Sequence, residues 1–166
     1  MHPGCCSCSP ILDNTAVYSI YGGIPLYFIR HRKVRFEDCD PAGIVFYPRY
    51  ILMLHRHFED WFAEGLGFSL GVLNVDRLTG FPVKSLHVEF LRPSRIEEVL
   101  EWKLMVTAIR QAAVTLTITG DCDQERRLKA TITVVAVNLT KVPLRPCIIP
   151  EDVKTEMMSY VYECSN

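Results

Sequence analysis

The chain has 166 residues, of which 49% are hydrophobic and 22% charged, with a formal net charge of −1. This length and composition predict one globular domain with a sizeable core. The near-neutral charge argues against a nucleic-acid-binding protein, which usually carries a basic face. No apolar run reaches the length of a membrane span, and the first ten residues lack the pattern of a secretory signal.

Seven cysteines are scattered along the chain, and their odd number is a poor basis for a disulfide framework. They favour a reducing compartment, so we expect a cytoplasmic protein. Cys5, Cys6 and Cys8 lie near His2, and Cys5 and Cys8 have the C-x2-C spacing, but no second ligand pair of the kind that completes a zinc site stands out elsewhere in the sequence. We therefore expect no metal or other cofactor. Residues 1–24 are interpreted as an irregular amino-terminal extension ahead of a domain at 25–166.

The first expected elements are a strand and a long helix. Alternating apolar and polar residues over 27–36 predict the strand. After a Pro-Gly break, residues 47–67 carry apolar side chains at spacings of three and four, which predicts a helix with one wide apolar face. Pro48 suits the first turn of this helix, and Gly65 and Gly67 supply its end.

The rest of the chain is expected to be mostly strand, after a short helical piece near 69–76. Alternation predicts four strands, in residues 81–93, 99–110, 111–122 and 126–140. Residues 150–160 begin with a proline and two acids, which is typical of a helix start. Consecutive strands with short links favour an antiparallel sheet. We therefore predict an α+β fold in which a curved antiparallel sheet wraps around one long central helix.

Residues 38–50 read DCDPAGIVFYPRY and join the first strand to the long helix. This motif and the order of the elements resemble the hot-dog fold of the 4-hydroxybenzoyl-CoA thioesterase family. The resemblance extends from about Tyr27 to about Tyr160 and includes a weaker match in HVEFLRPSRIEEVLEW. It implies an acyl-CoA thioesterase that converts an aromatic thioester, such as 4-hydroxybenzoyl-CoA, or a short-chain one to free acid and CoA.

The resemblance implies that Asp40 is the catalytic carboxylate and that the backbone N–H of Tyr47 binds the thioester oxygen. A helix start suits this task, because its free N–H groups and partial positive charge stabilise an oxygen that becomes negative in the transition state. Gly43 can adopt a backbone conformation that other residues resist, and it leaves room for substrate. Asp40 could attack the thioester carbon or act as a general base on water, and the sequence leaves both routes open.

Without the motif, an aspartate before a proline near a helix start would more often be a turn or cap residue. Cys39 is interpreted as a packing residue, because the flanking acids disfavour a thiolate. Asp38 is given at most a minor role. Three acids further along the helix are interpreted as ordinary polar-face residues, namely Glu59, Asp60 and Glu64.

Binding residues also follow from the resemblance. It implies a basic cluster for the phosphates of CoA between two long strands, represented here by Arg110 and Gln111. Acyl carrier protein is an alternative donor, since its phosphopantetheine arm shares the thiol end of CoA. Other basic residues that could contact phosphate are Arg126, Arg127, Lys129 and Arg145.

Phe46, His55 and Phe81 are expected to line the acyl pocket, with His55 where 4-hydroxybenzoyl-specific relatives carry a polar or acidic group. His55 and His57 are two residues apart and do not share a helical face, which argues against a metal pair. Active sites of the family lie between two subunits, so a homodimer or homotetramer is implied. A hot-dog hydratase or dehydratase and a non-enzymatic acyl-CoA binder stay open as alternatives.

Overall fold

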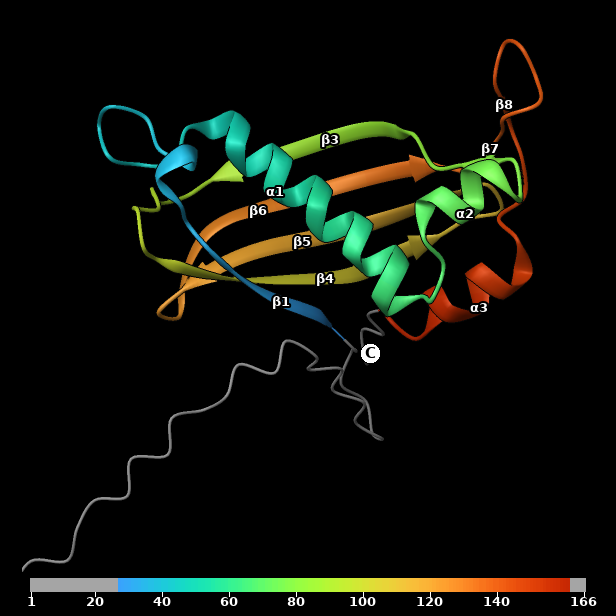
Figure 1. The fold of residues 1–166 in the computed structure, drawn as a ribbon. Coiled ribbons are helices and arrows are strands. Elements are labelled where there is room, and N and C mark those ends of the chain that lie inside the picture. The colour runs from blue at the N-terminus through green and yellow to red at the C-terminus, as the bar shows by residue number, and fades with distance from the viewer. Residues whose placement is uncertain (1–26, 162–166) are drawn as a thin grey trace, which may run out of the picture.

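The computed structural model describes residues 27–161, so the expected extension and its cysteines lie outside the described part. The main body is a five-stranded antiparallel sheet in the order β1-β4-β5-β6-β3. Helix α1 crosses one face of this sheet (Figure 1). The α+β class and the antiparallel sheet are therefore confirmed. The strands are β1 Phe28–Lys33, β3 Val83–Phe90, β4 Val99–Ile109, β5 Ala113–Cys122 and β6 Glu125–Val135.

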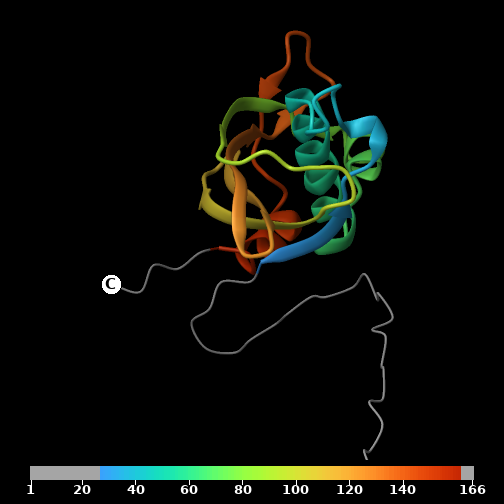
Figure 2. The same cartoon turned by 90° about the vertical axis from the view of Figure 1, so that its left-hand side faces the viewer.

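Helix α1 runs over Tyr47–Asp60 and continues through a wider π-helical turn at Trp61–Gly65. Pro48 lies in its first turn, where a missing N–H breaks no intrahelical bond. The buried face of α1 is turned to the sheet, and in Figure 2 the strands from β3 to β1 form a curved layer around it. The buried residues of α1 are Tyr50, Met53, Leu54, His57 and Phe58.

Alternation along the strands produces the core. On β4, every second side chain from Leu100 to Val106 is fully buried, while the residues between them are partly exposed. The fully buried set on this strand is Leu100, Trp102, Leu104 and Val106. The strand predicted at 99–110 is thus confirmed.

Small elements close the end of the sheet that lies away from the start of α1 (Figure 1). Helix α2, Leu70–Val75, begins after Ser69, whose hydroxyl accepts a hydrogen bond from the Val72 N–H (3.2 Å). A second, three-stranded sheet has the order β2-β7-β8 and was not predicted. Its strands are β2 Thr79–Gly80, β7 Val137–Asn138 and β8 Arg145–Pro146, and the last helix is α3 Glu151–Met158.

Two strands differ from expectation. Strand β1 ends at Lys33, and Phe36 lies instead in a 3₁₀ turn, η1 Phe36–Asp38, with 84% of its surface exposed. The Asp38 carboxylate accepts a hydrogen bond from the Arg35 N–H (2.9 Å), which favours this turn over further strand. Strand β3 is an edge strand, and its apolar side chains Val83 and Leu86 are exposed rather than buried.

Candidate active site

Residues 38–46 form a narrow loop, called here the Asp40 loop, that leads into α1. At its base the Phe46 N–H donates to the Asp38 carbonyl (2.9 Å). Further out, the Asp40 N–H donates to the Ile44 carbonyl (2.9 Å). Because the two arms of the loop pair in this way, Asp40 lies only two residues from Asp38, which is hydrogen-bonded to the residue that precedes α1.

The tip of the Asp40 loop is a tight turn that requires glycine. Gly43 has a φ of +75°, a conformation that side chains with a Cβ rarely adopt. Nothing lies within 4 Å of a Cβ built at this position, so the backbone angle alone imposes the glycine. The turn also uses the side chain of Asp40, whose Oδ1 accepts a hydrogen bond from the Ala42 N–H (2.8 Å). Among residues 27–161, nothing donates to the second carboxylate oxygen.

The start of α1 presents an open hydrogen-bond donor. The Arg49 N–H donates a hydrogen bond to the Phe46 carbonyl (2.8 Å), and Pro48 has no N–H. Within the described chain, no group accepts a hydrogen bond from the Tyr47 N–H. Because the amino end of a helix carries a partial positive charge, this N–H suits an oxygen that gains negative charge.

An apolar groove of about 270 Å³, called here the Tyr47 groove, opens beside this donor. The Phe90 ring packs edge-on against the Tyr47 ring, with 6.3 Å between centroids, and lies 5.7 Å from the Tyr50 ring. Arg92 is the one charged residue in the lining. The groove is lined by Ile44, Val45, Tyr47, Tyr50, Phe90, Leu91, Arg92 and Pro93.

A second, almost wholly apolar pocket of about 300 Å³ lies between α1 and β3 and is called here the α1–β3 pocket. His55 is its one ionisable residue, and the imidazole of His55 faces the carboxylate of Glu59 at 3.4 Å. The pocket is lined by Ile51, Leu52, Leu54, His55, Phe58, Val83, Leu86 and Ile132.

The predicted pocket residues are not all together. His55 lines the α1–β3 pocket, and Phe46 is half-exposed beside the Tyr47 ring, with 5.5 Å between centroids. Phe81 is buried in the core against Phe62 at 5.0 Å and lines neither the Tyr47 groove nor the α1–β3 pocket.

Arg110 and Gln111 lie in the turn between β4 and β5, at the end of the sheet opposite the Asp40 loop (Figure 1). The eleven-residue strand β4 separates this turn from that loop, which is roughly 35 Å at the usual rise per strand residue. Within one chain, these two residues and Asp40 therefore do not share a ligand site.

The neighbours of Asp40 have structural contacts. Asp38 is buried, and its carboxylate accepts a hydrogen bond from the Arg35 N–H at the start of its own 3₁₀ turn. Cys39 is partly buried against the core, and its thiol lies 3.7 Å from the Arg35 carbonyl. Burial and the carboxylates of Asp38 and Asp40 raise the pKa of Cys39, which opposes formation of a thiolate.

Two of the acids on and just after α1 form ion pairs with arginines of β1. Arg30 pairs with Glu64 and Arg32 pairs with Asp60, so both carboxylates connect α1 to the neighbouring edge strand. Glu59 remains an exposed acid beside His55. Each of the three acids thus has a basic partner in the fold.

His57 was noted in the sequence only as a poor metal ligand, and the structure buries it completely between the rings of Phe28 (5.2 Å) and Trp102 (6.2 Å). Neither ring nitrogen has a hydrogen-bond partner among residues 27–161. Burial, with the positive charges of Arg32 and Arg30, lowers the pKa of His57 to about 3.

Among residues 27–161, no three His, Cys, Asp or Glu side chains lie close enough together to hold a metal ion.

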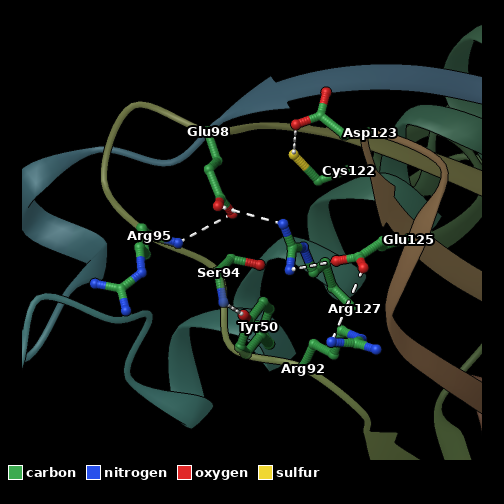
Figure 3. Close-up of polar contacts among 9 residues, drawn as sticks. All are labelled: Tyr50, Arg92, Ser94, Arg95, Glu98, Cys122, Asp123, Glu125 and Arg127. Atoms are coloured by element: carbon green, nitrogen blue, oxygen red, sulfur yellow. Dashed lines mark hydrogen bonds and ion pairs between the residues drawn. The ribbon is translucent and has the colours of Figure 1, made fainter.

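A polar network joins the segment between β3 and β4 to Tyr50 of α1 and Arg127 of β6 (Figure 3). The segment between β3 and β4 carries Ser94, whose N–H donates to the Tyr50 hydroxyl (2.9 Å). The Glu98 carboxylate accepts from the Arg95 N–H (3.1 Å) and from the Arg127 guanidinium (3.3 Å). Tyr50 falls on the apolar face predicted for the helix at 47–67, and nothing in the sequence indicates this contact.

Residues 34–157 match the thioesterase-like superfamily, and the chain belongs to that family. This membership confirms the hot-dog fold and the expected class of thioester hydrolase.

Individual relatives cover most of the described chain. An acyl-CoA thioesterase, YbgC, of Haemophilus influenzae is 25% identical over 130 residues, covering 74% of this chain and 88% of the relative. A 1,4-dihydroxy-2-naphthoyl-CoA hydrolase of Acaryochloris marina is 30% identical over 110 residues, which are 64% of this chain and 80% of that one.

The crystal structure of a 1,4-dihydroxy-2-naphthoyl-CoA thioesterase from Synechocystis superposes with a TM-score of 0.73. The two chains are 19% identical, and the match covers 80% of this chain and 96% of the other, so it supports the fold alone.

None of the described helices is long and apolar enough to cross a membrane.

Proposed function

We propose that this chain hydrolyses acyl-CoA thioesters, with Asp40 as the catalytic carboxylate and the Tyr47 N–H as the donor to the thioester oxygen. One observation carries the proposal: the Asp40 loop, the open N–H and the Tyr47 groove meet at the start of α1. Both groups belong to the junction between the loop and the helix, where an acyl carbonyl can contact them together.

The proposed reaction starts with the carbonyl oxygen of the thioester accepting a hydrogen bond from the Tyr47 N–H. In one route, an Asp40 oxygen attacks the carbonyl carbon, the C–S bond breaks, and CoA leaves as a thiolate that takes up a proton. Water then hydrolyses the mixed anhydride and restores the carboxylate. In the other route, Asp40 takes a proton from water while that water attacks the same carbon; the C–S bond then breaks, and the CoA thiolate takes up the proton from Asp40 and leaves with the free acid as the second product.

The acyl group proposed is a short-chain or aromatic one held in the α1–β3 pocket. Leu54 in the lining of this pocket is seven residues along α1 from Tyr47, or roughly 10 Å at the rise of an α-helix. The walls are apolar, with His55 as the one ionisable residue. This chemistry favours an unsubstituted ring or an aliphatic chain over a 4-hydroxybenzoyl group, whose phenol would need a polar partner.

A homo-oligomer belongs to the proposal, with a dimer as the minimum and a tetramer as the larger form. Strand β3 is a sheet edge whose exposed side chains include Val83, Leu86 and Phe90, and an exposed apolar edge favours pairing. In such an assembly, Arg110 and Gln111 of one chain would contact the CoA bound at the Asp40 loop of another. A cytoplasmic location and acyl carrier protein as an alternative donor also remain part of the proposal.

The test is thiol release from a panel of aromatic and aliphatic acyl-CoAs by wild type, Asp40→Asn and a control, Asp76→Asn, at the exposed end of α2. We expect release by wild type and by the control, and a loss of at least about a hundredfold in Asp40→Asn. The order of the panel then identifies the acyl class.

Other outcomes count against the proposal in defined ways. Release that is equal in Asp40→Asn and wild type would exclude Asp40 as the catalyst. Acyl-CoA binding by calorimetry without any release, from CoA or from acyl carrier protein, would indicate a binder. Water addition to an enoyl-CoA without thiol release would indicate a hydratase.

A further inference from the structure

We propose that Tyr50 is a positioning residue, whose hydroxyl fixes the Asp40 loop through the backbone of Ser94. The effect on rate rests on the proposed function of Asp40. The contacts themselves are features of the fold and can be tested without any substrate.

The contacts form a short chain from the helix to the loop. The Tyr50 hydroxyl accepts a hydrogen bond from the Ser94 N–H (2.9 Å), and the Ser94 carbonyl accepts one from the Val45 N–H (2.9 Å). Val45 in turn forms an antiparallel bridge with Cys39, the residue before Asp40. Ser94 is fully buried and Tyr50 nearly so, which keeps water from replacing these bonds.

Tyr50 is well placed to link the two parts of the proposed site. It follows Tyr47 by three residues, so both lie on neighbouring parts of the helix surface, and helical side chains lean toward the amino end. Its ring lines the Tyr47 groove beside Phe90. The ring therefore contacts the groove beside the proposed thioester donor, while the hydroxyl accepts the hydrogen bond from the segment that carries Ser94.

The segment that carries Ser94 is also held from its other side (Figure 3). Ile44 bridges Arg95, and the Glu98 carboxylate accepts hydrogen bonds from the Arg95 N–H and from Arg127. The side chain of Arg127 is only 12% exposed, so this attachment to β6 is sheltered from water. With these contacts fixed, the Tyr50 hydroxyl determines how closely the loop approaches the start of α1.

Tyr50→Phe tests the inference, because phenylalanine keeps the ring and its contact with Phe90. Loss of one buried hydrogen bond should lower kcat by about three- to tenfold while KM stays within about twofold. The amides of Ser94 and Val45 should exchange with deuterium faster than in wild type.

Tyr160→Phe is the matched control. The Tyr160 hydroxyl is buried and donates to the Gly65 carbonyl (3.1 Å) at the opposite end of the same helix. The chemical change and the number of hydrogen bonds lost are the same, so a similar fall in Tm is expected. A purely structural effect would lower kcat equally in both variants, whereas positioning lowers it in Tyr50→Phe alone.

The inference is overturned if kcat is unchanged in Tyr50→Phe, if both variants lose activity equally, or if Val45 exchange matches wild type. Its failure differs from failure of the proposed function. An unchanged rate in Asp40→Asn would remove Asp40 as the catalyst, while amide exchange in Tyr50→Phe would still report whether the hydroxyl holds the loop.

Discussion

At the residue scale, His57 couples the stability of this fold to pH. The buried imidazole has a pKa of about 3, against 6.5 for a free histidine. Besides Arg30 and Arg32, its surroundings include the rings of Phe28 and Trp102 and the backbone of Phe28, whose contact raises the pKa but does not outweigh burial. The folded protein therefore keeps this histidine neutral at pH values where the unfolded chain takes up a proton.

We predict that acid weakens the fold through His57. Its contribution is fully present above about pH 6.5 and is lost progressively as the pH falls toward about 3, because the unfolded state binds the proton first. At pH 5 the loss is about 2 kcal/mol. Urea unfolding at pH 7.5 and pH 5 should show this loss in wild type and a smaller one in His57→Phe.

The exposed His87 offers the control for this experiment. Its side chain is 75% exposed, so His87→Gln should keep the pH dependence of wild type. A wild-type free energy of unfolding that is equal at the two pH values would contradict the assignment to His57.

Residues of the site differ in how far the sequence reveals them. Asp40, Gly43 and Tyr47 fall in one continuous motif, so their shared loop could be predicted from local chemistry. Tyr50 has its hydrogen-bond partner 44 residues away, on a segment joined to the helix only in the folded chain. A tyrosine on an apolar helix face was the one available signal, since a buried hydroxyl usually needs a partner.

At the element scale, the π-helical turn at the end of α1 depends on the absence of a side chain at Gly65. A Cβ there would lie 2.7 Å from Cδ1 of Trp61 and 3.1 Å from the Tyr160 hydroxyl oxygen. Trp61 is fully buried and has no room to move. The glycine therefore allows close packing rather than an unusual backbone angle.

Gly65→Ala should lower the free energy of unfolding by about 1–3 kcal/mol, as overpacking of a filled core does. Gly71→Ala in α2 is the matched control, because the nearest atom to its added Cβ is 3.8 Å away. The control should be neutral or slightly stabilising, as alanine favours helix. Equal midpoints for both variants in urea would show that the core adapts at Gly65.

Elements were predictable in proportion to their length. Strands of eight residues or more and α1 have clear periods, and each formed within the segment that its pattern indicated, except that β6 begins at Glu125 and ends at Val135, short of the predicted residue 140. Strands β2, β7 and β8 have two residues each, which is too short for any period. The early end of β1 depends on the side-chain contact from Asp38 to the Arg35 N–H, and alternation carries no information about such a contact.

At the scale of the whole molecule, the free edge of β3 predicts self-association. Leu86 is 40% exposed on this strand and also lines the α1–β3 pocket. Light scattering after gel filtration should give wild type the mass of a dimer or a larger form. Leu86→Glu should shift the mass toward the monomer, because a charge would be desolvated in the interface.

Val75→Glu serves as the comparison, since Val75 is also exposed but lies on α2. Its mass should equal that of wild type. A monomeric wild type, or a shift with Val75→Glu alone, would contradict pairing through β3.

The separation of Arg110 from Asp40 has a genetic consequence. Suppose that each site contains Asp40 of one chain and Arg110 of its partner. A mixed dimer of one Asp40→Asn chain and one Arg110→Gln chain then has both substitutions in one site and neither in the other. Random mixing of the two inactive or weakened proteins would then leave about a quarter of all sites intact. Two defective alleles of this gene would therefore complement each other in one cell, although neither supports the reaction alone.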